Sequence, residues 1–409
     1  MTNQTSPTYA SQELQLPCGA VIKNRIAKAA MTERLANKRQ YANKELENLY
    51  RHWNNNGAGL LITGNIMIDG RYKEASANLV LEDEKAIASL SKMVAAGSTN
   101  GTHLWAQISH AGRQSSIFST FRPIAPSAIQ LKKLLLFAKP KAMTLEQIKD
   151  VENRFVKTAL LCQKVGFTGV QVHAAHGYLI SQFLSSNTNA RTDEYGGTME
   201  NKTRLLVDVV KCIRKEVGRD FPISVKLNSA DFQRGGFDEE DALYVIKSLD
   251  QLGIDLLEIS GGTYENLKFL TERYQRKSTR KREAYFMNFA RKVKEHTNLP
   301  IMVTGGFRSH SFCEEVLKNK ELEMIGFARP FLTEKHFPKH FLKESNSRIN
   351  DATIDFKIKK LKDFAEAGFY DYQIHRLAKG KTLQPKYNPY LGVFRMTMNE
   401  LFKGWFKFI

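Results

Sequence analysis

The stretch Val172-His-Ala-Ala-His-Gly-Tyr178 places two imidazoles and a phenol close together in the sequence. It follows a short β-branched run, residues 169–172, which predicts a strand that ends where these side chains begin. His173, His176 and Tyr178 can then reach one face, where they could hold a carbonyl oxygen and deliver a proton. The alternative is structural, with two hydrogen-bonded core histidines and a packing tyrosine. Three such groups so close together favour a catalytic site.

Apolar runs of strand length recur eight times along the chain and alternate with amphipathic segments. The expected strands are residues 24–30, 60–68, 103–109, 169–175, 222–229, 256–260, 300–306 and 324–329. The expected helices are residues 43–56, 83–96, 144–165, 201–217, 238–252, 282–297 and 310–320. Most begin after Asp, Asn, Thr or Ser and several end at glycine, as real helices do. Strict alternation predicts an α/β fold with a parallel sheet, and eight repeats predict a closed (β/α)8 TIM barrel.

The two ends of the chain depart from this alternation. Residues 14–21, with Pro17 and Gly19, predict a short N-terminal hairpin that could plug the far mouth of the barrel. Beyond the last strand, residues 354–368 predict a basic helix that packs on the barrel as its eighth. We therefore expect a (β/α)8 barrel over residues 1–335. A helical extension over residues 336–409 would pack on this barrel or lie at a subunit interface.

Barrel enzymes place their chemistry at the carboxyl ends of the strands, where most unusual residues of this chain fall. After strands seven and eight, the usual phosphate site of such barrels, stand Gly305, Gly306, Gly326, Ala328 and Arg329. Across the rim, a cradle for a flat polar ring is offered by Ala29, Ala30, Met31, Thr32, Gly64, Gln107 and Lys226. FMN is such a phosphorylated ring, and Lys226 could stabilise negative charge on its reduced form. Structural alternatives exist, since Lys226 could instead pair with a carboxylate inside the barrel and Gln107 could bond to backbone.

Several of these stretches resemble the Old Yellow Enzyme family of FMN-dependent ene-reductases. They are residues 23–32, 107–113, 172–178, 183–185, 191–197, 226–231 and 303–306, and the resemblance covers residues 14–335. It implies that His173 and His176 hold the substrate's carbonyl oxygen and that Tyr178 donates a proton. It also implies that Thr32, Gln107 and Lys226 face the flavin ring, while the phosphate is held by Gly305, Gly306, Ala328 and Arg329.

Two departures from the family pattern matter. Lys226 stands where many relatives have arginine, which keeps the charge but loses the bidentate fork. The cysteine cluster and the extra nucleotide-binding domains of the larger relatives have no counterpart in this sequence. The resemblance then implies direct reduction by a nicotinamide nucleotide.

Composition narrows the class of protein. The chain has 409 residues with 61 lysines and arginines against 42 aspartates and glutamates, a formal charge of +19. No nucleic-acid motif accompanies this charge, so we expect a solvated basic surface and no nucleic-acid partner. The four cysteines are scattered without a Cys-x-x-Cys pair, so no metal site is indicated. The absence of a signal-like segment or a bilayer-spanning apolar stretch favours a cytoplasmic protein.

These features predict an oxidoreductase that uses FMN to pass hydride from NAD(P)H to the C=C bond of an enone or enal. The two substrates would occupy one site in turn, in a ping-pong reaction. A flavin-dependent oxidase or demethylase on the same barrel is one alternative, and a protein that binds a membrane surface peripherally is another. The sequence leaves open the physiological substrate, the choice between NADH and NADPH, and whether the chain forms a homo-oligomer.

Two basic segments suggest further partners. The tail, residues 394–409, has apolar side chains at helical spacing beside lysines, as in helices that lie on anionic membranes. A helix docked on the barrel or on another subunit is the structural alternative, and it is more common. The run of residues 273–282 (RYQRKSTRKR) could clamp nucleotide or CoA phosphates near the barrel mouth.

Overall fold

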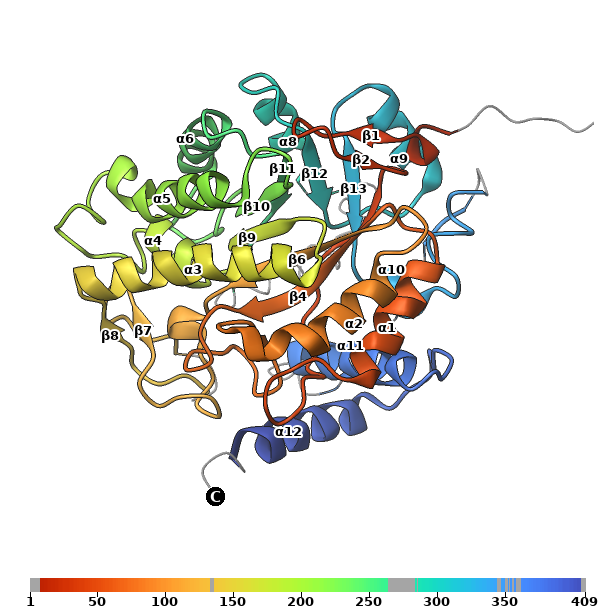
Figure 1. Cartoon of the computed structure of the whole chain (residues 1–409), viewed down its shortest axis with the longest axis horizontal. Coiled ribbons are helices and arrows are strands. Elements are labelled where there is room, and N and C mark those ends of the chain that lie inside the picture. The colour runs from red at the N-terminus through yellow and green to blue at the C-terminus, as the bar shows by residue number, and fades with distance from the viewer. Residues whose placement is uncertain are drawn as a thin grey trace, which may run out of the picture.

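Eight parallel strands close into a barrel in the computed structural model of the chain (Figure 1). The structure describes residues 8–405, apart from residues 133–135, 264–283, 285, 344–346, 350, 351, 353, 355, 356 and 358–361. The barrel strands are β3 (Ile26–Lys28), β4 (Leu60–Met67), β6 (His103–Ser109), β9 (Val170–Ala174), β10 (Ile223–Asn228), β11 (Leu256–Ser260), β12 (Ile301–Thr304) and β13 (Met324–Phe327). β3 pairs with both β4 and β13, so the ring is complete and the predicted TIM barrel is confirmed.

Helices cover the outside of this ring between successive strands. They are α1 (Lys44–Asn55), α2 (Ile87–Gly97), α3 (Leu145–Val165), α5 (Met199–Val217), α6 (Glu239–Asp250), α8 (Met287–Lys294) and α9 (His310–Lys318). Local sequence sets their ends: Thr144 and Asp238 begin α3 and α6 with capping boxes, and Gly166 ends α3 in the left-handed conformation. A short helix, α4 (Leu179–Leu184), follows β9 directly.

The described core has two large clusters, one on each side of the strands, and a small third cluster of Met67, Val80, Ala111 and Tyr178. Side chains between strands and helices form the larger cluster, with the large buried rings of Tyr50, Trp53 and Phe155. The second cluster fills the inside of the barrel at the amino-terminal ends of the strands. There Leu14, Leu16 and Ile22 pack with side chains from the starts of the strands. Leu16 and Ile22 belong to the hairpin made by β1 (Leu14–Gln15) and β2 (Val21–Ile22), so the hairpin predicted from the sequence closes this mouth.

Smaller elements lie in the loops. β5 (Leu79–Val80) pairs with β4, and β7 (Ile124–Ala125) pairs with β8 (Lys141–Ala142). Short 3-10 helices in the described residues are η1 (Tyr9–Ser11), η2 (Glu84–Ala86) and η3 (Gly112–Gln114).

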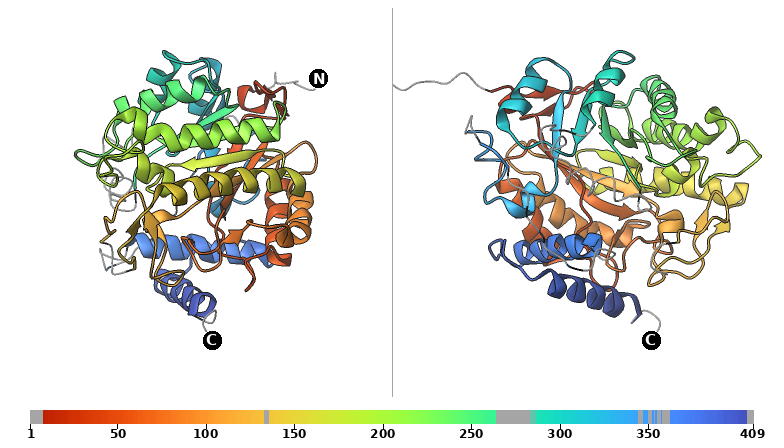
Figure 2. Two further views of the ribbon diagram at one scale, coloured as in Figure 1. Left: turned by 60° about the vertical axis from the view of Figure 1, so that its left-hand side comes forward. Right: turned by 180° about the vertical axis from the view of Figure 1, so that it is seen from behind.

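After β13 the chain forms α10 (Pro330–Thr333), α11 (Lys362–Ala378) and α12 (Pro389–Trp405). α11 contacts α1 and so takes the place of the eighth helix, with α12 packed outside it (Figure 2). Helix α11 covers the last part of the expected range, residues 354–368, and continues beyond it to Ala378, with buried apolar side chains as far as Leu377. Residues 358–361 lie outside the described residues. Helix α8, Met287–Lys294, lies within the expected range 282–297 and is shorter than it, while residues 282, 283 and 285 lie outside the described residues.

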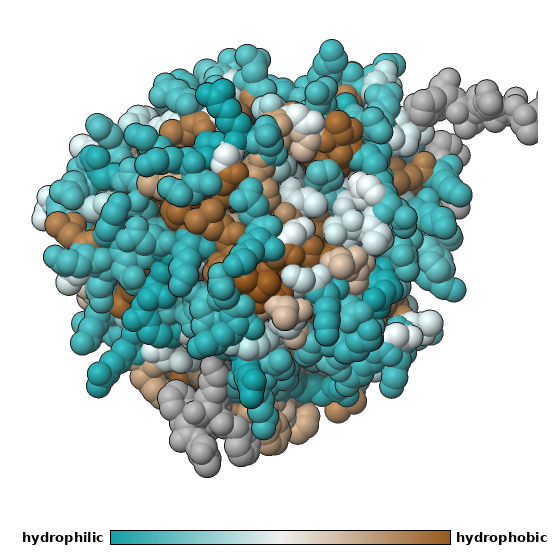
Figure 3. Space-filling model, in the orientation of Figure 1, coloured by the Kyte–Doolittle hydropathy of each residue, from teal (hydrophilic) through white to brown (hydrophobic). Residues whose placement is uncertain are grey.

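Hydrophilic residues predominate on the face shown in Figure 3, as the charge of the chain requires. Every helix in the described part of the chain is too short or too polar to cross a membrane. α12 forms the predicted helical tail, and its exposed apolar residues are Tyr390, Leu391, Phe394 and Phe402. Contact with a membrane surface stays a prediction. The basic run at 273–282 lies outside the described residues.

Candidate active site

The two histidines and the tyrosine singled out from the sequence meet at the carboxyl end of β9. His173 is in the strand, His176 is in the turn that follows with a φ of 60°, and Tyr178 is the N-cap of α4. The ring centre of His173 lies 5.2 Å from that of His176 and 4.8 Å from that of Tyr178. The strand end and the tight turn therefore bring all three side chains to one place.

Hydrogen bonds fix both imidazoles. The backbone N–H of Ala175 donates to Nδ1 of His173 at 3.2 Å, which leaves the proton of a neutral ring on Nε2. Nε2 of His176 lies 2.9 Å from the hydroxyl of Ser260, and its backbone N–H donates to Asn228. The rings are held from three neighbouring strands, β9, β10 and β11.

Both histidines are neutral because the site is buried. Burial, and then the charges of His176 and Lys226, hold the pKa of His173 well below its usual range. Burial and Lys226 lower the pKa of His176 to about 3. Neutral imidazole N–H groups are suited to donate hydrogen bonds to a carbonyl oxygen whose charge grows during a reaction.

A polar chain crosses the barrel beneath these rings. Gln107 donates to Gln171 at 2.6 Å, and Gln171 donates to Glu258 at 2.8 Å. Glu258 forms an ion pair with Lys226 at 2.8 Å, with both side chains almost fully buried. Lys226 therefore pairs with a carboxylate inside the barrel, as the structural alternative for this lysine anticipated. Lys226 is also next to His173 in the β9–β10 register.

Thr32 faces the same region from the loop after β3. Its hydroxyl donates to Glu74, and the phenol of Tyr178 donates to the other oxygen of the same carboxylate. Earlier in the same loop, the backbone N–H of Ala29 donates to the carbonyl of Phe327, and this hydrogen bond joins the loop to β13. Ala30 and Met31 lie between Ala29 and Thr32 in the sequence and are partly exposed. The N–H of Gly64 donates to Glu33 at 2.9 Å, close behind this loop.

The predicted phosphate site is a cradle of glycines. Gly305 and Gly306 have φ values of 123° and 87°, which side-chain-bearing residues rarely adopt. Gly326 pairs with Thr304, whose buried hydroxyl oxygen has no hydrogen-bond partner among the described residues. A Cβ on Gly326 would collide with that oxygen.

Ala328 and Arg329 follow β13 beside this cradle. The guanidinium of Arg329 lies 3.8 Å from Glu366 and over the ring of Tyr370, so in this structure its side chain contacts α11. Whether it binds a phosphate stays a prediction.

The sequence reasoning missed Gln171, Glu258 and Glu74. The first two could have been noticed, because a polar residue inside an otherwise apolar strand is unusual and needs a partner. Glu74 comes from a loop of ordinary polar composition, where no sequence signal distinguishes it.

Comparison with known proteins identifies the family. A sequence model of the NADH:flavin oxidoreductase / NADH oxidase family matches residues 18–347. The chain belongs to this family. It is 32% identical over 371 residues to the NADH-dependent flavin oxidoreductase iliE of Hypocrea jecorina (strain QM6a), covering 85% of this chain and 92% of that protein. The resemblance to Old Yellow Enzymes drawn from the sequence is therefore confirmed, as are the FMN cofactor and the nicotinamide nucleotide as reductant expected of this family.

Other relatives differ in length. The NADH-dependent flavin oxidoreductase iliE of Neonectria sp. (strain DH2) is 34% identical over 357 residues, which are 81% of this chain but 46% of that protein. The chain thus spans about half the length of that relative. Among solved structures, the Old Yellow Enzyme homologue from Zymomonas mobilis superimposes with a TM-score of 0.70 at 23% identity, covering 87% of this chain and 98% of that one. This likeness supports the fold.

Proposed function

We propose that this flavin oxidoreductase reduces the C=C bond of α,β-unsaturated carbonyl compounds with electrons from NADH or NADPH. The observation that carries the proposal is the meeting of His173, His176 and Tyr178 at the barrel rim. Two neutral imidazole N–H groups can donate hydrogen bonds to a carbonyl oxygen, and the adjacent phenol can act as the acid.

The residues present fit FMN at both ends of the rim. Gly305 and Gly306 adopt backbone conformations in which N–H groups could approach a phosphate closely, and the buried hydroxyl of Thr304, beside Gly326, offers a donor there. Gln107 and Lys226 would meet the ring from inside the barrel and Thr32 would meet it from the loop after β3. Bound there, FMN supplies the hydride that it has received from the nicotinamide nucleotide.

The chain's own residues would then act on the substrate. His173 and His176 would hold the carbonyl oxygen and stabilise the negative charge that it gains as the β-carbon accepts hydride. Tyr178 would give its proton to the α-carbon. Because NAD(P)H and the enone need the same face, the reaction would run in two half-reactions.

Stopped-flow measurement of each half-reaction tests this assignment. Tyr178→Phe should slow reoxidation of the reduced enzyme by an enone about a hundredfold, the usual contribution of a general acid, and leave reduction by NADH within a factor of about two. Tyr195→Phe is the matched control, since the ring of Tyr195 is buried and packs on the ring of Phe183. Equal loss in both half-reactions would refute the role of Tyr178.

The same experiment separates the two enzyme classes. Anaerobic reoxidation of the reduced wild-type enzyme by an enone supports the ene-reductase. Reoxidation by oxygen alone, with no reaction towards any enone or enal, would favour the oxidase or demethylase instead.

A further inference from the structure

We propose that Glu74 resupplies the proton that Tyr178 gives to the substrate, which makes it a positioning and proton-relay residue for the proposed reaction. The inference rests on the proposed function and extends it to a residue in the loop after β4. One carboxylate oxygen of Glu74 accepts from the phenol of Tyr178. The other accepts from the hydroxyl of Thr32 and, at 3.2 Å, from the amide of Asn78.

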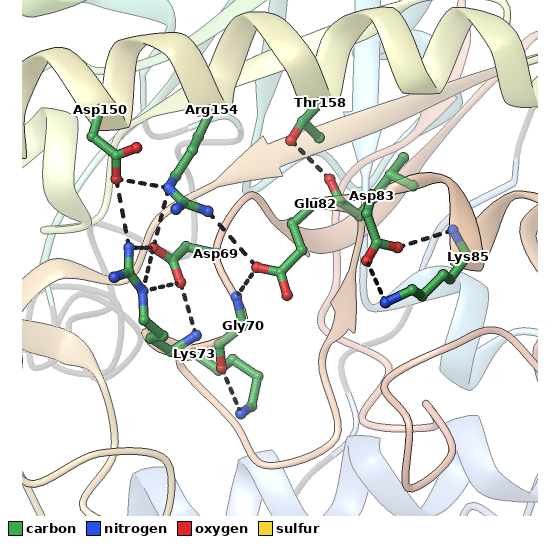
Figure 4. A network of polar contacts seen from close by, with 11 residues as sticks. Asp69, Gly70, Lys73, Glu82, Asp83, Lys85, Asp150, Arg154 and Thr158 are labelled. Carbon is green, nitrogen blue, oxygen red and sulfur yellow. Dashed lines mark hydrogen bonds and ion pairs between the residues drawn. The ribbon is translucent and has the colours of Figure 1, made fainter.

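The loop that carries Glu74 is fixed on its first side by ion pairs. Asp69 is buried and pairs with Arg71 at 2.6 Å and with Arg154 of α3 at 3.5 Å (Figure 4). The ammonium of Lys73 donates to the carbonyl of Gly70 at 3.1 Å, also drawn in Figure 4. The residues immediately before Glu74 are therefore anchored to a long barrel helix.

The second side of the loop is held by α12. The backbone N–H of Ser76 donates to the carboxylate of Glu400 at 2.8 Å, and the carbonyl of Ala77 accepts from the N–H of Ala36 at 3.2 Å. Asn78 also bonds back to the N–H of Ala75. Anchored on both sides, the loop holds the carboxylate of Glu74 against the phenol.

Exposure differs between the two partners. Tyr178 is 4% exposed, whereas Glu74 is partly exposed. The neighbouring imidazoles of His173 and His176 are neutral, and Lys226 is engaged with Glu258. A proton from water can reach the carboxyl group more readily than the phenol behind it.

The proton balance is simple. The phenol O–H bond breaks as a C–H bond forms at the α-carbon, which leaves a phenolate on Tyr178. The carboxylate of Glu74 then takes a proton from solvent and passes a proton to this phenolate, which restores the phenol and the carboxylate. One hydride and one solvent proton are added across the C=C bond in each turnover. A phenolate beside an ionised carboxylate is unfavourable, so uptake of the solvent proton by this pair is favoured.

Substitution at Glu74 tests the relay. Glu74→Gln keeps acceptors for Thr32 and Asn78 but cannot pass a proton, so enone-dependent reoxidation should fall roughly tenfold to a hundredfold while reduction by NADH stays unchanged. Glu74→Asp should recover part of the rate. In Glu74→Ala, which leaves a space, added acetic acid should restore reoxidation in a saturable way, and the restoration should vanish in the Glu74→Ala, Tyr178→Phe double variant.

A spectroscopic readout is independent of turnover. In FMN-free protein, the near-ultraviolet difference between wild type and Tyr178→Phe should show the red shift of a tyrosine that donates to a carboxylate. The same difference measured in the Glu74→Gln background should lack it.

The outcomes separate the two proposals. Wild-type reoxidation rates in Glu74→Gln, or a slow Glu74→Ala enzyme that acetic acid does not restore, would overturn the relay. Identical difference spectra in the two backgrounds would overturn the hydrogen bond on which it depends. Failure of the wild-type enzyme to react with any enone would instead overturn the proposed function, while the spectra would still report on the contact.

Discussion

The buried ion pair between Lys226 and Glu258 gives the sharpest stability prediction. Lys226 is 4% exposed at its side chain and Glu258 is fully buried, with 2.8 Å between nitrogen and oxygen. Lys226→Met would remove the ammonium group that pairs with the carboxylate of Glu258. That carboxylate would keep its hydrogen bond from the Gln171 amide. Breaking a buried pair from one side costs about 3–5 kcal/mol. For a chain of 409 residues, we expect the thermal midpoint to fall by about 5 °C.

Thermal unfolding of matched variants measures this effect. Lys226→Met, Glu258→Gln and the double variant should be compared as FMN-free protein and again at saturating FMN, so that lost cofactor binding is seen separately. The double variant should be more stable than Lys226→Met, because the unpaired charge is gone. Lys292→Met is the control: its partner Glu239 lies at 2.6 Å, but both side chains are well exposed. If Lys226→Met loses no more stability than this control, the reasoning fails.

Three further predictions concern the site and its supports. Gly326→Ala should lower FMN affinity at least tenfold in a fluorescence titration, because its Cβ would collide with Thr304. Acid should destabilise the fold, since burial lowers the pKa of His110 to about 4 and of His176 to about 3. The unfolded chain takes up these protons first, so each ring should cost about 1 kcal/mol between pH 6.5 and 5.5 in denaturant titrations, with no such loss above pH 7. Glu400→Ala should speed hydrogen exchange in residues 71–78 while the barrel strands keep their protection, and unchanged exchange there would contradict the anchoring role.

The barrel was predictable because its signals are local. Each buried parallel strand reads as a continuous apolar run, and helix ends such as Thr144 and Gly166 follow capping chemistry. The grouping of His173, His176 and Tyr178 was predictable for the same reason, since all three come from one strand end and its turn.

The partners from elsewhere were not predictable. Glu258 meets Lys226, and Glu74 meets Tyr178, only because the ring brings separate strands and loops together. The predicted eighth helix also ended too early, at residue 368, whereas the buried apolar side chains of α11 continue to Leu377. Charge marks solvent exposure, whereas the spacing of buried residues decides where a helix lies.

The contact between α12 and the loop after β4 has a consequence for folding. Ser76 and Glu400 are 324 positions apart, so the loop leaves the ribosome long before the helix that secures it has been made. The barrel can begin to collapse from its local repeats, but its rim must wait for the distant helix. The ordered arrangement of the candidate active site would then be among the last features that the nascent protein acquires.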